Sequence, residues 1–266
     1  MDSPTNEANM KVCVTTMVSG NYEWYVPLFL YCGMRAYPGY DFKIFVRNRT
    51  SLPETYKSYI CDNAYSSYPQ NGPTTAAVRF IEGEKELRGY DCCLITDIDV
   101  LLMKEEPPLI SQHLAHMEHY CLGCYCNYQS HQLPDGYRCS GVHFVTKDWW
   151  EPTREAREKW MFNVKNGECS EKDTDEIMLG KIIQESKLPP PPEAQLLWNI
   201  HGIHLRRWWP KSNPMQYPQP GAQESLVMQE LTNDKEFLEL VAMCAEHMPI
   251  IGKIVSTMEK IIKGGR

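Results

Sequence analysis

The chain has 266 residues, of which 42% are hydrophobic and 23% charged, a globular balance that excludes a disordered protein. Acidic residues outnumber Lys and Arg by 34 to 27, and the net charge of −7 argues against electrostatic binding of nucleic acid as the main role. The eleven cysteines are odd in number and lie in apolar runs, which predicts reduced thiols and a cytoplasmic protein. The sequence pattern leads us to expect neither a signal peptide nor a transmembrane helix.

The N-terminal part of the sequence alternates between patterns typical of strands and of helices. We predict strands at 10–18, 40–46 and 90–103, helices at 22–37, 53–61 and 74–87, and a polar loop at 66–73. The Pro38-Gly39 pair marks the end of the first helix. This alternation predicts an α/β fold in which helices cover the faces of a parallel sheet.

The C-terminal part is less regular. We predict strands at 119–128, 139–150 and 194–205, helices at 149–166, 173–186 and 234–262, and a loop at 210–220. These elements favour one domain, with residues 1–220 as its main part and residues 221–266 as a helical extension. Apolar residues recur at helical spacing over 250–262, which predicts a face that packs on the protein's own core. The alternative is a peripheral contact with an anionic membrane surface.

The stretch Asp97-Ile98-Asp99 is the most informative motif, because it directly follows an apolar strand. Ligands of open α/β sheets bind at the carboxyl ends of strands. Two carboxylates placed there repel each other unless a cation lies between them, and Mg²⁺ or Mn²⁺ commonly links carboxylates to substrate phosphates. The motif therefore predicts a metal site that holds a diphosphate, whereas the plainer interpretation is a pair of acidic residues in an exposed turn.

Five segments, in the right order, resemble a known family of enzymes. The segments are VCVTTMVSGNYEWYVPLFL, TTAAVRFIEGEKELRGYDCCLITDIDVLLM, DGYRCSGVHFVTKDWW, EKDTDEIML and NIHGIHLRRWW. They are similar to motifs of GT-A fold glycosyltransferases, in particular the retaining group that includes bacterial lipopolysaccharide galactosyltransferases and glycogenin. The resemblance implies a Rossmann-like mixed sheet flanked by helices, a nucleoside diphosphate sugar (a UDP-sugar) as donor, and Mn²⁺ or Mg²⁺ as cofactor.

The resemblance also implies roles for individual residues. Donor contacts fall on Thr15, Thr16, Asn21, Tyr22, Arg79, Asp97, Ser140, Gly141, Arg206 and Arg207. The metal ligands fall on Asp97, Asp99 and His201, with His204 as the alternate, and Asp173 or Asp175 could supply the catalytic carboxylate. The chain departs from the family at Cys139, where the family usually has Asn, and at Thr174, where it has Gln. The implied partners are a sugar donor and a glycan or lipid-linked glycan acceptor in polysaccharide or glycoconjugate synthesis, in the cytoplasm or at the inner face of a membrane.

Two other functions compete with this one. A sugar-phosphate nucleotidyltransferase should have a Gly-rich phosphate loop after the first strand, but that loop has one glycine, Gly20. A zinc-stabilised binding module could use a run of histidines and cysteines. Its candidate ligands are His113, His116, His119, Cys121, Cys124 and Cys126. These cysteines fit a core strand equally well, and a second pair of cysteines at zinc-finger spacing is missing.

Overall fold

The computed structural model describes residues 9–46, 51–61, 68, 76–128, 130–170, 172–192, 201–211 and 220–264. The predicted loop at 66–73 therefore lies almost wholly outside the described residues, as do most of the predicted strand at 194–205 and of the predicted loop at 210–220.

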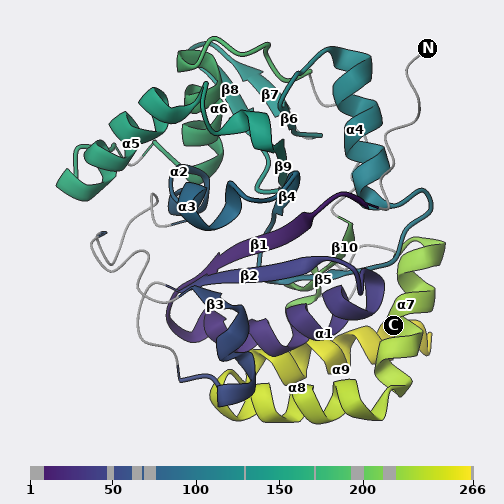
Figure 1. Ribbon diagram of the computed structural model, residues 1–266. Coiled ribbons are helices and arrows are strands. Elements are labelled where there is room, and N and C mark those ends of the chain that lie inside the picture. The colour runs from purple at the N-terminus through teal and green to yellow at the C-terminus, as the bar shows by residue number, and fades with distance from the viewer. Residues whose placement is uncertain are drawn as a thin grey trace.

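A six-stranded mixed sheet forms the centre of the fold (Figure 1). Its order is β3-β2-β1-β4-β9-β6. The strands are β1 (Val12–Val18), β2 (Asp41–Val46), β3 (Ile60–Cys61), β4 (Cys92–Ile95), β6 (Tyr125–Cys126) and β9 (His143–Thr146). The pairs β1–β2, β1–β4 and β2–β3 are parallel, whereas β9 is antiparallel to both β4 and β6. Because β1 and β4 are buried on both faces, they read as continuous apolar runs in the sequence.

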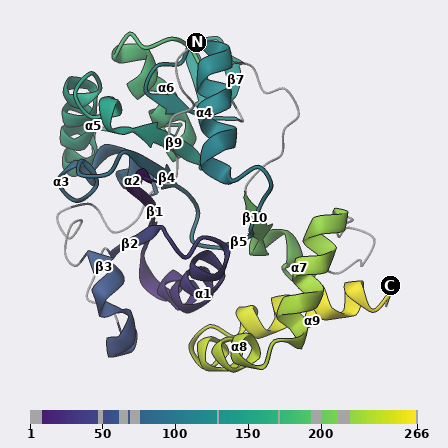
Figure 2. The same cartoon turned by 45° about the vertical axis from the view of Figure 1, so that its right-hand side comes forward.

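Helices cover both faces of this sheet, as Figures 1 and 2 show. On one face, the short helix η2 (Gly20–Tyr25) leads into α1 (Val26–Ala36). On the other face lie α2 (Val78–Ile81), α3 (Glu84–Leu87), η4 (Lys147–Trp149), α5 (Arg154–Asn166) and α6 (Asp175–Glu185). The helix α4 (Leu109–Tyr120) packs beside β6, and the hairpin β7 (Ser130–Leu133) and β8 (Gly136–Cys139) packs on α6. The predicted α/β fold with a mixed sheet is confirmed.

The predicted strand at 90–103 is two strands that belong to different sheets. After β4, the chain turns at Asp97–Asp99 and continues as β5 (Val100–Leu102). β5 leaves the large sheet and pairs antiparallel with β10 (Gly202–His204), which is followed by η5 (Leu205–Trp208). The two aspartates thus lie where one chain segment passes from the large sheet to the small one.

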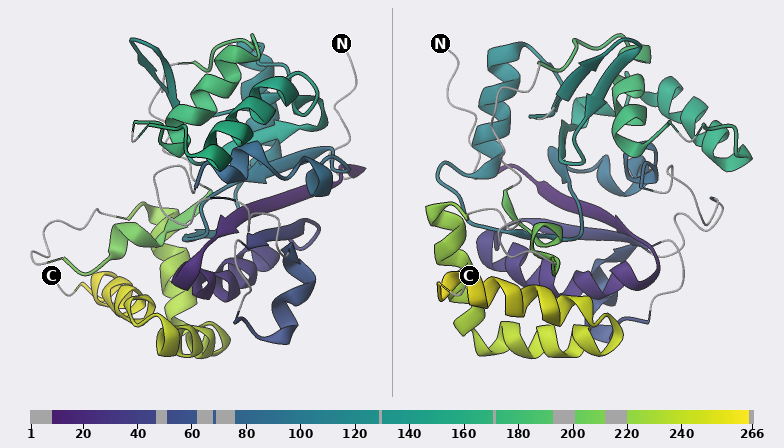
Figure 3. Two further views of the ribbon diagram at one scale, coloured as in Figure 1. Left: turned by 90° about the vertical axis from the view of Figure 1, so that its left-hand side faces the viewer. Right: turned by 180° about the vertical axis from the view of Figure 1, so that it is seen from behind.

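The C-terminal extension is a group of three helices, α7 (Ala222–Asn233), α8 (Lys235–His247) and α9 (Ile250–Ile262). α8 and α9 lie outside α1, on the side away from the sheet (Figure 3). The predicted single helix at 234–262 is divided at Pro249, because a proline interrupts the hydrogen bonds of a helix interior. The predicted C-terminal helical extension is confirmed.

The apolar face of α9 belongs to the protein core. Ile251, Ile254, Val255 and Met258 are at most 4% exposed, because α9 packs on α7, α8 and η5. This burial supports the predicted packing of the apolar stripe on the protein's own core. Among the residues in the described ranges, no helix combines the length and apolar character needed to span a membrane.

The predicted elements at 53–61 and 119–128 also differ from the structure. Residues 54–59 form a 3₁₀-helix, η3 (Glu54–Tyr59), rather than an α-helix, and the predicted strand at 119–128 begins inside α4. Cys121 ends α4 in a left-handed conformation with a φ of 53°, so only Tyr125–Cys126 remains as strand. The apolar character of this stretch reflects burial rather than a long strand.

Candidate metal centre

Asp97 and Asp99 lie at the carboxyl end of β4. The amide of Thr96 donates to the carbonyl of Thr15 at 3.0 Å, which extends the β1–β4 pairing to the edge of the motif. The amide of Val100 then donates to the carbonyl of Asp97 at 3.3 Å and closes a tight turn. Asp99 is only 6% exposed, whereas the Asp97 side chain is 35% exposed. The turn therefore presents one buried and one accessible carboxylate.

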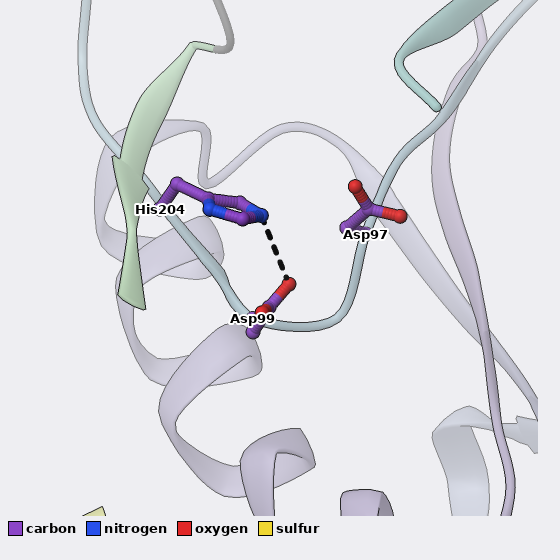
Figure 4. Close-up of side chains that lie close together, drawn as sticks. All are labelled: Asp97, Asp99 and His204. Carbon is purple, nitrogen blue, oxygen red and sulfur yellow. Dashed lines mark ion pairs between the residues drawn. The ribbon is translucent and has the colours of Figure 1, made fainter. Parts of the chain in front are cut away.

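The strand pairing of β10 brings His204 to these carboxylates. His204 pairs with Val100 in the β5–β10 ladder, and the amide of Leu205 donates to the carbonyl of Asp99 at 2.7 Å. His204 Nε2 lies 3.4 Å from Asp99 Oδ1, and Asp97 lies across from both (Figure 4). One ligand atom from each of the three residues lies within 4.8 Å of the others.

The donor set fits a hard divalent cation. Two carboxylates and one imidazole suit Mn²⁺ or Mg²⁺ better than the softer metals that thiolates select. Burial raises the pKa of Asp99, and the charge of Asp97 raises it further against the opposing effect of His204. The two crowded carboxylates thus disfavour each other's charge, which a cation between them would offset.

Arg79 is the buried positive charge of the site. It lies on α2, is 7% exposed, and donates to Asp97 and, at 2.9 Å, to Oδ2 of Asp175. Burial alone would lower the pKa of Arg79, but Asp97 and Asp175 outweigh burial and raise it. Burial would likewise raise the pKa of Asp97, but the guanidinium of Arg79 holds it below its usual value. Asp97 and Arg79 therefore form a charged pair.

These groups surround a cavity of about 440 Å³. Eight of the residues singled out in the sequence line it, namely Tyr22, Arg79, Asp97, Asp99, Gly141, Asp175, His204 and Arg206. Sequence reasoning missed its other lining residues, Met17, Ser19, Ala76, Ile98 and Glu176. Met17 and Ser19 could have been found from their place at the carboxyl end of β1, because Asp97 follows the neighbouring strand β4.

The backbone of Gly141 passes close to the charged pair of Arg79 and Asp97. A Cβ atom at this position would lie 2.6 Å from the Arg79 guanidinium and 3.0 and 3.1 Å from the Asp97 carboxylate oxygens. Only the absence of a side chain lets this backbone pass so near the pair.

Five of the predicted donor contacts do not line this cavity, namely Thr15, Thr16, Asn21, Ser140 and Arg207. Thr15 and Thr16 are at most 1% exposed, and the Thr15 hydroxyl donates to the carbonyl of Lys43 at 2.9 Å. The Ser140 hydroxyl donates to a neighbouring carbonyl, that of Val142, at 3.1 Å. Asn21 is exposed outside the cavity wall. Thr15 and Thr16 are thus part of the core of β1.

Arg207 lies on a different cavity from Arg206. It lines a space of about 460 Å³ together with Glu105, Gln112 and Glu224. Of the two adjacent arginines, Arg206 is therefore the one placed at the metal centre.

Of the two predicted catalytic carboxylates, Asp175 lines the cavity and Asp173 does not. Asp173 is 7% exposed, forms an ion pair with Lys181, and accepts from the amide and hydroxyl of Ser170, each at 2.8 Å. Burial would raise the pKa of Asp173, but the hydrogen bonds from Lys181 and Ser170 lower it. Asp173 thus holds the start of α6, and we correct the prediction in favour of Asp175.

His201 is separated from the two aspartates, which corrects its prediction as third metal ligand. It is fully buried, its Nδ1 lies 2.7 Å from Glu105 Oε2, and its Nε2 lies 2.9 Å from His113 Nε2. Both ring nitrogens are thus engaged away from Asp97 and Asp99. The alternate, His204, is the histidine that the structure brings to the pair.

The predicted zinc cluster does not assemble. Within the described ranges, Asp97, Asp99 and His204 are the one group of three or more such side chains whose ligand atoms gather. Cys126 Sγ lies 3.2 Å from His116 Nδ1, but Cys121 is exposed at the end of α4. Burial raises the pKa of the Cys124 thiol to about 11, which disfavours the thiolate that zinc binds.

No protein-family model matches the chain, and no curated protein is similar to it in sequence. Similar solved structures include the galactosyltransferase LgtC in complex with donor and acceptor sugar analogues, at 14% identity and a TM-score of 0.38, over 64% of this chain and 70% of that one. The glycosyltransferase GlyE of Streptococcus pneumoniae TIGR4 is 16% identical with a TM-score of 0.44, over 67% and 44%. The bifunctional glycosyltransferase WbbM is 11% identical with a TM-score of 0.42, over 74% and 41%. At TM-scores below 0.5, these similarities do not establish the function of this chain.

Proposed function

We propose that the chain is a metal-dependent glycosyltransferase that moves a sugar from a nucleoside diphosphate donor, a UDP-sugar, to a glycan acceptor. The observation that supports it is the meeting of Asp97, Asp99 and His204 with Arg79 and Arg206 around one cavity. In this proposal residues 1–220 carry the catalytic site, and residues 221–266 support it as an extension packed on α1.

The charges around the cavity match the chemistry of sugar transfer. When the bond between the sugar and the diphosphate breaks, negative charge develops on the leaving phosphate. A divalent cation held by Asp97, Asp99 and His204 supplies electrostatic stabilisation of that charge. Arg206 lines the same cavity and offers a planar fork that suits a phosphate. Arg79 holds Asp97 ionised and so keeps a metal ligand ready.

In this proposal, two further residues face the nucleobase and the sugar of the donor. Tyr22, 38% exposed at the cavity, offers an aromatic face to the nucleobase. Asp175 lies across the Arg79 guanidinium from Asp97, where its carboxylate can face the positive charge that develops on the sugar.

A thermal-shift experiment with UDP tests the proposal. At 100 times its Kd, a ligand of the folded state stabilises by about 2.7 kcal/mol. For a chain of this size, that amounts to a rise in Tm of roughly 5–10 °C. We expect this rise in wild type with Mn²⁺ and UDP, but not with UDP and EDTA, and not in Asp97→Asn.

The matched control is Asp148→Asn, since Asp148 is an exposed aspartate in η4. It should keep the full rise. An equal rise in EDTA, or in Asp97→Asn, contradicts the metal centre. Release of pyrophosphate from a nucleoside triphosphate and a sugar phosphate, without release of UDP from a UDP-sugar, would identify a nucleotidyltransferase instead.

A further inference from the structure

Three buried polar side chains, linked by hydrogen bonds, lie outside the cavity of the metal centre. Glu105 follows β5 and is 8% exposed, while His201 and His113 are fully buried. His201 bridges the other two, with its Nδ1 2.7 Å from Glu105 Oε2 and its Nε2 2.9 Å from His113 Nε2. Glu105 also accepts from the side chain of Gln112 at 2.7 Å. A buried polar chain of this kind is costly unless its members satisfy one another.

Hydrogen bonds hold the His201 ring on both sides. Glu105 offers acceptors, so the proton between it and His201 belongs to His201 Nδ1. Burial lowers the pKa of His113 well below its usual value, and the nearby His201 lowers it further, so His113 is neutral with a single N–H. His113 Nε2 and His201 Nε2 share a hydrogen bond, whereas His113 Nδ1 has no hydrogen-bond partner. Glu105 and His113 thus orient the His201 ring from both sides.

His201 is also the residue that leads into β10. Its backbone has a φ of 57°, a left-handed conformation that is uncommon outside glycine, and its carbonyl accepts from the amide of Met103 at 2.9 Å. The next residue, Gly202, packs so closely on β5 that a Cβ atom would lie 2.2 Å from the carbonyl oxygen of Leu101. His204 follows in the same strand and faces Asp99.

We propose that Glu105, His201 and His113 are positioning residues that fix β10 on β5 and so set the affinity of the metal centre through His204. This inference rests on the proposed metal-dependent function. None of the three residues lines the cavity of the metal centre; they act through the backbone of a three-residue strand. Their removal loosens the position of His204 while Asp97 and Asp99 stay in place on the turn after β4.

The experiment is a titration with Mn²⁺ alone, followed by electron paramagnetic resonance of the free ion. The variants are His113→Phe, Glu105→Gln and His201→Asn. Phe keeps the ring that stacks on Phe144, whose centroid is 4.5 Å away, and Asn tolerates the left-handed backbone. Loss of residues that orient metal ligands typically costs roughly 10–100-fold in metal affinity, and we expect the lower end, about tenfold, because the effect passes through the backbone. The control His119→Asn, an exposed histidine of α4, should leave the affinity unchanged.

A double-mutant cycle separates positioning from general loosening. In a His204→Asn background, His113→Phe should change the Mn²⁺ affinity by less than about twofold, because no histidine is left to position. An undiminished tenfold loss in that background overturns the proposal. The proposal is also overturned if every variant that folds binds Mn²⁺ with wild-type affinity while Asp97→Asn abolishes binding. That result would leave the proposed function intact. If wild type binds no Mn²⁺, the metal centre and the inference both fail. Thermal melts identify the variants that fold. If His201→Asn does not fold, the affinity of Glu105→Gln decides the question.

Discussion

Gly141→Ala tests the cavity with the smallest possible change. The added methyl carbon would lie 2.6 Å from the Arg79 guanidinium and 3.0 Å from an Asp97 carboxylate oxygen, where ordinary contacts begin at 3.4 Å. Arg79 must therefore retreat by about 0.8 Å and Asp97 by about 0.4 Å, since overlapping atoms cannot share this space. Both are ends of flexible side chains, so the backbone need not shift.

We expect Gly141→Ala to lower the activity much more than the stability of the fold. A displacement of about 1 Å at a reacting centre can cost on the order of 100-fold in rate, so kcat/KM with a UDP-sugar should fall between 10- and 100-fold. We expect overpacking to cost about 1 kcal/mol of stability, the low end for a core insertion, because only side-chain ends move. Tm should then fall by only about 2–4 °C.

The assay is UDP release from a UDP-sugar, with a thermal melt of the same sample. The matched control is Gly39→Ala, because a Cβ atom at Gly39 would meet nothing within 4 Å. It should keep both activity and Tm. Wild-type kcat/KM in Gly141→Ala would refute the reasoning, because the charged pair would then have no part in the reaction.

Four further predictions concern the donor, the product, the core and the ion pairs. Tyr22→Ala should raise the donor KM on the order of tenfold and change kcat less, since stacking on a base contributes about 1–3 kcal/mol to binding; a fall in kcat with an unchanged KM would contradict this placement. Proton NMR of the first-formed product should show retention, an α-linkage from an α-linked donor, and a β-linkage would exclude the retaining group. Ile254→Ala should cost about 2–5 kcal/mol in urea unfolding, whereas exposed Ser256→Ala should cost almost nothing; equal costs would mean that the α9 face is not core. Burial would raise the pKa of Glu84, but the hydrogen bond and charge of Arg157 lower it, so its stabilisation is present above about pH 4.3, the unfolded pKa, and is lost as pH falls through the lower folded pKa. Glu84→Gln should therefore flatten the acid side of the stability profile, and an unchanged profile would rule out this pair as its source.

The sequence predicted the metal motif because its signal is local. The apolar run before Asp97-Ile98-Asp99 indicates the strand β4, but the sequence did not show that the apolar run after the motif, β5, belongs to another sheet. The histidine was ambiguous because its partner is distant. His201 and His204 both belong to a predicted apolar strand, and only the register with β5 decides which one faces Asp99.

Other differences have equally physical causes. The resemblance implies donor contacts at Thr15 and Thr16, but strand pairing and burial place both side chains in the core. The β7–β8 hairpin could have been predicted from the sequence, since the stretch Pro134-Asp135-Gly136 is a typical turn. The charged pair of Arg79 with Asp175 joins α2 to α6, and no spacing in the sequence predicts such a contact between distant helices.

The β5–β10 ladder has only three residue pairs, whereas the ladder between β1 and β2 has six. Short ladders open locally at a lower free energy than the strands of a large sheet. His204 belongs to the last pair of this short ladder and Asp99 directly precedes β5, so a cation bound between them would resist the opening of the ladder. Part of the cation's binding energy would then be spent on local folding, and the amide hydrogen exchange of β10 would report occupancy of the site without any substrate present.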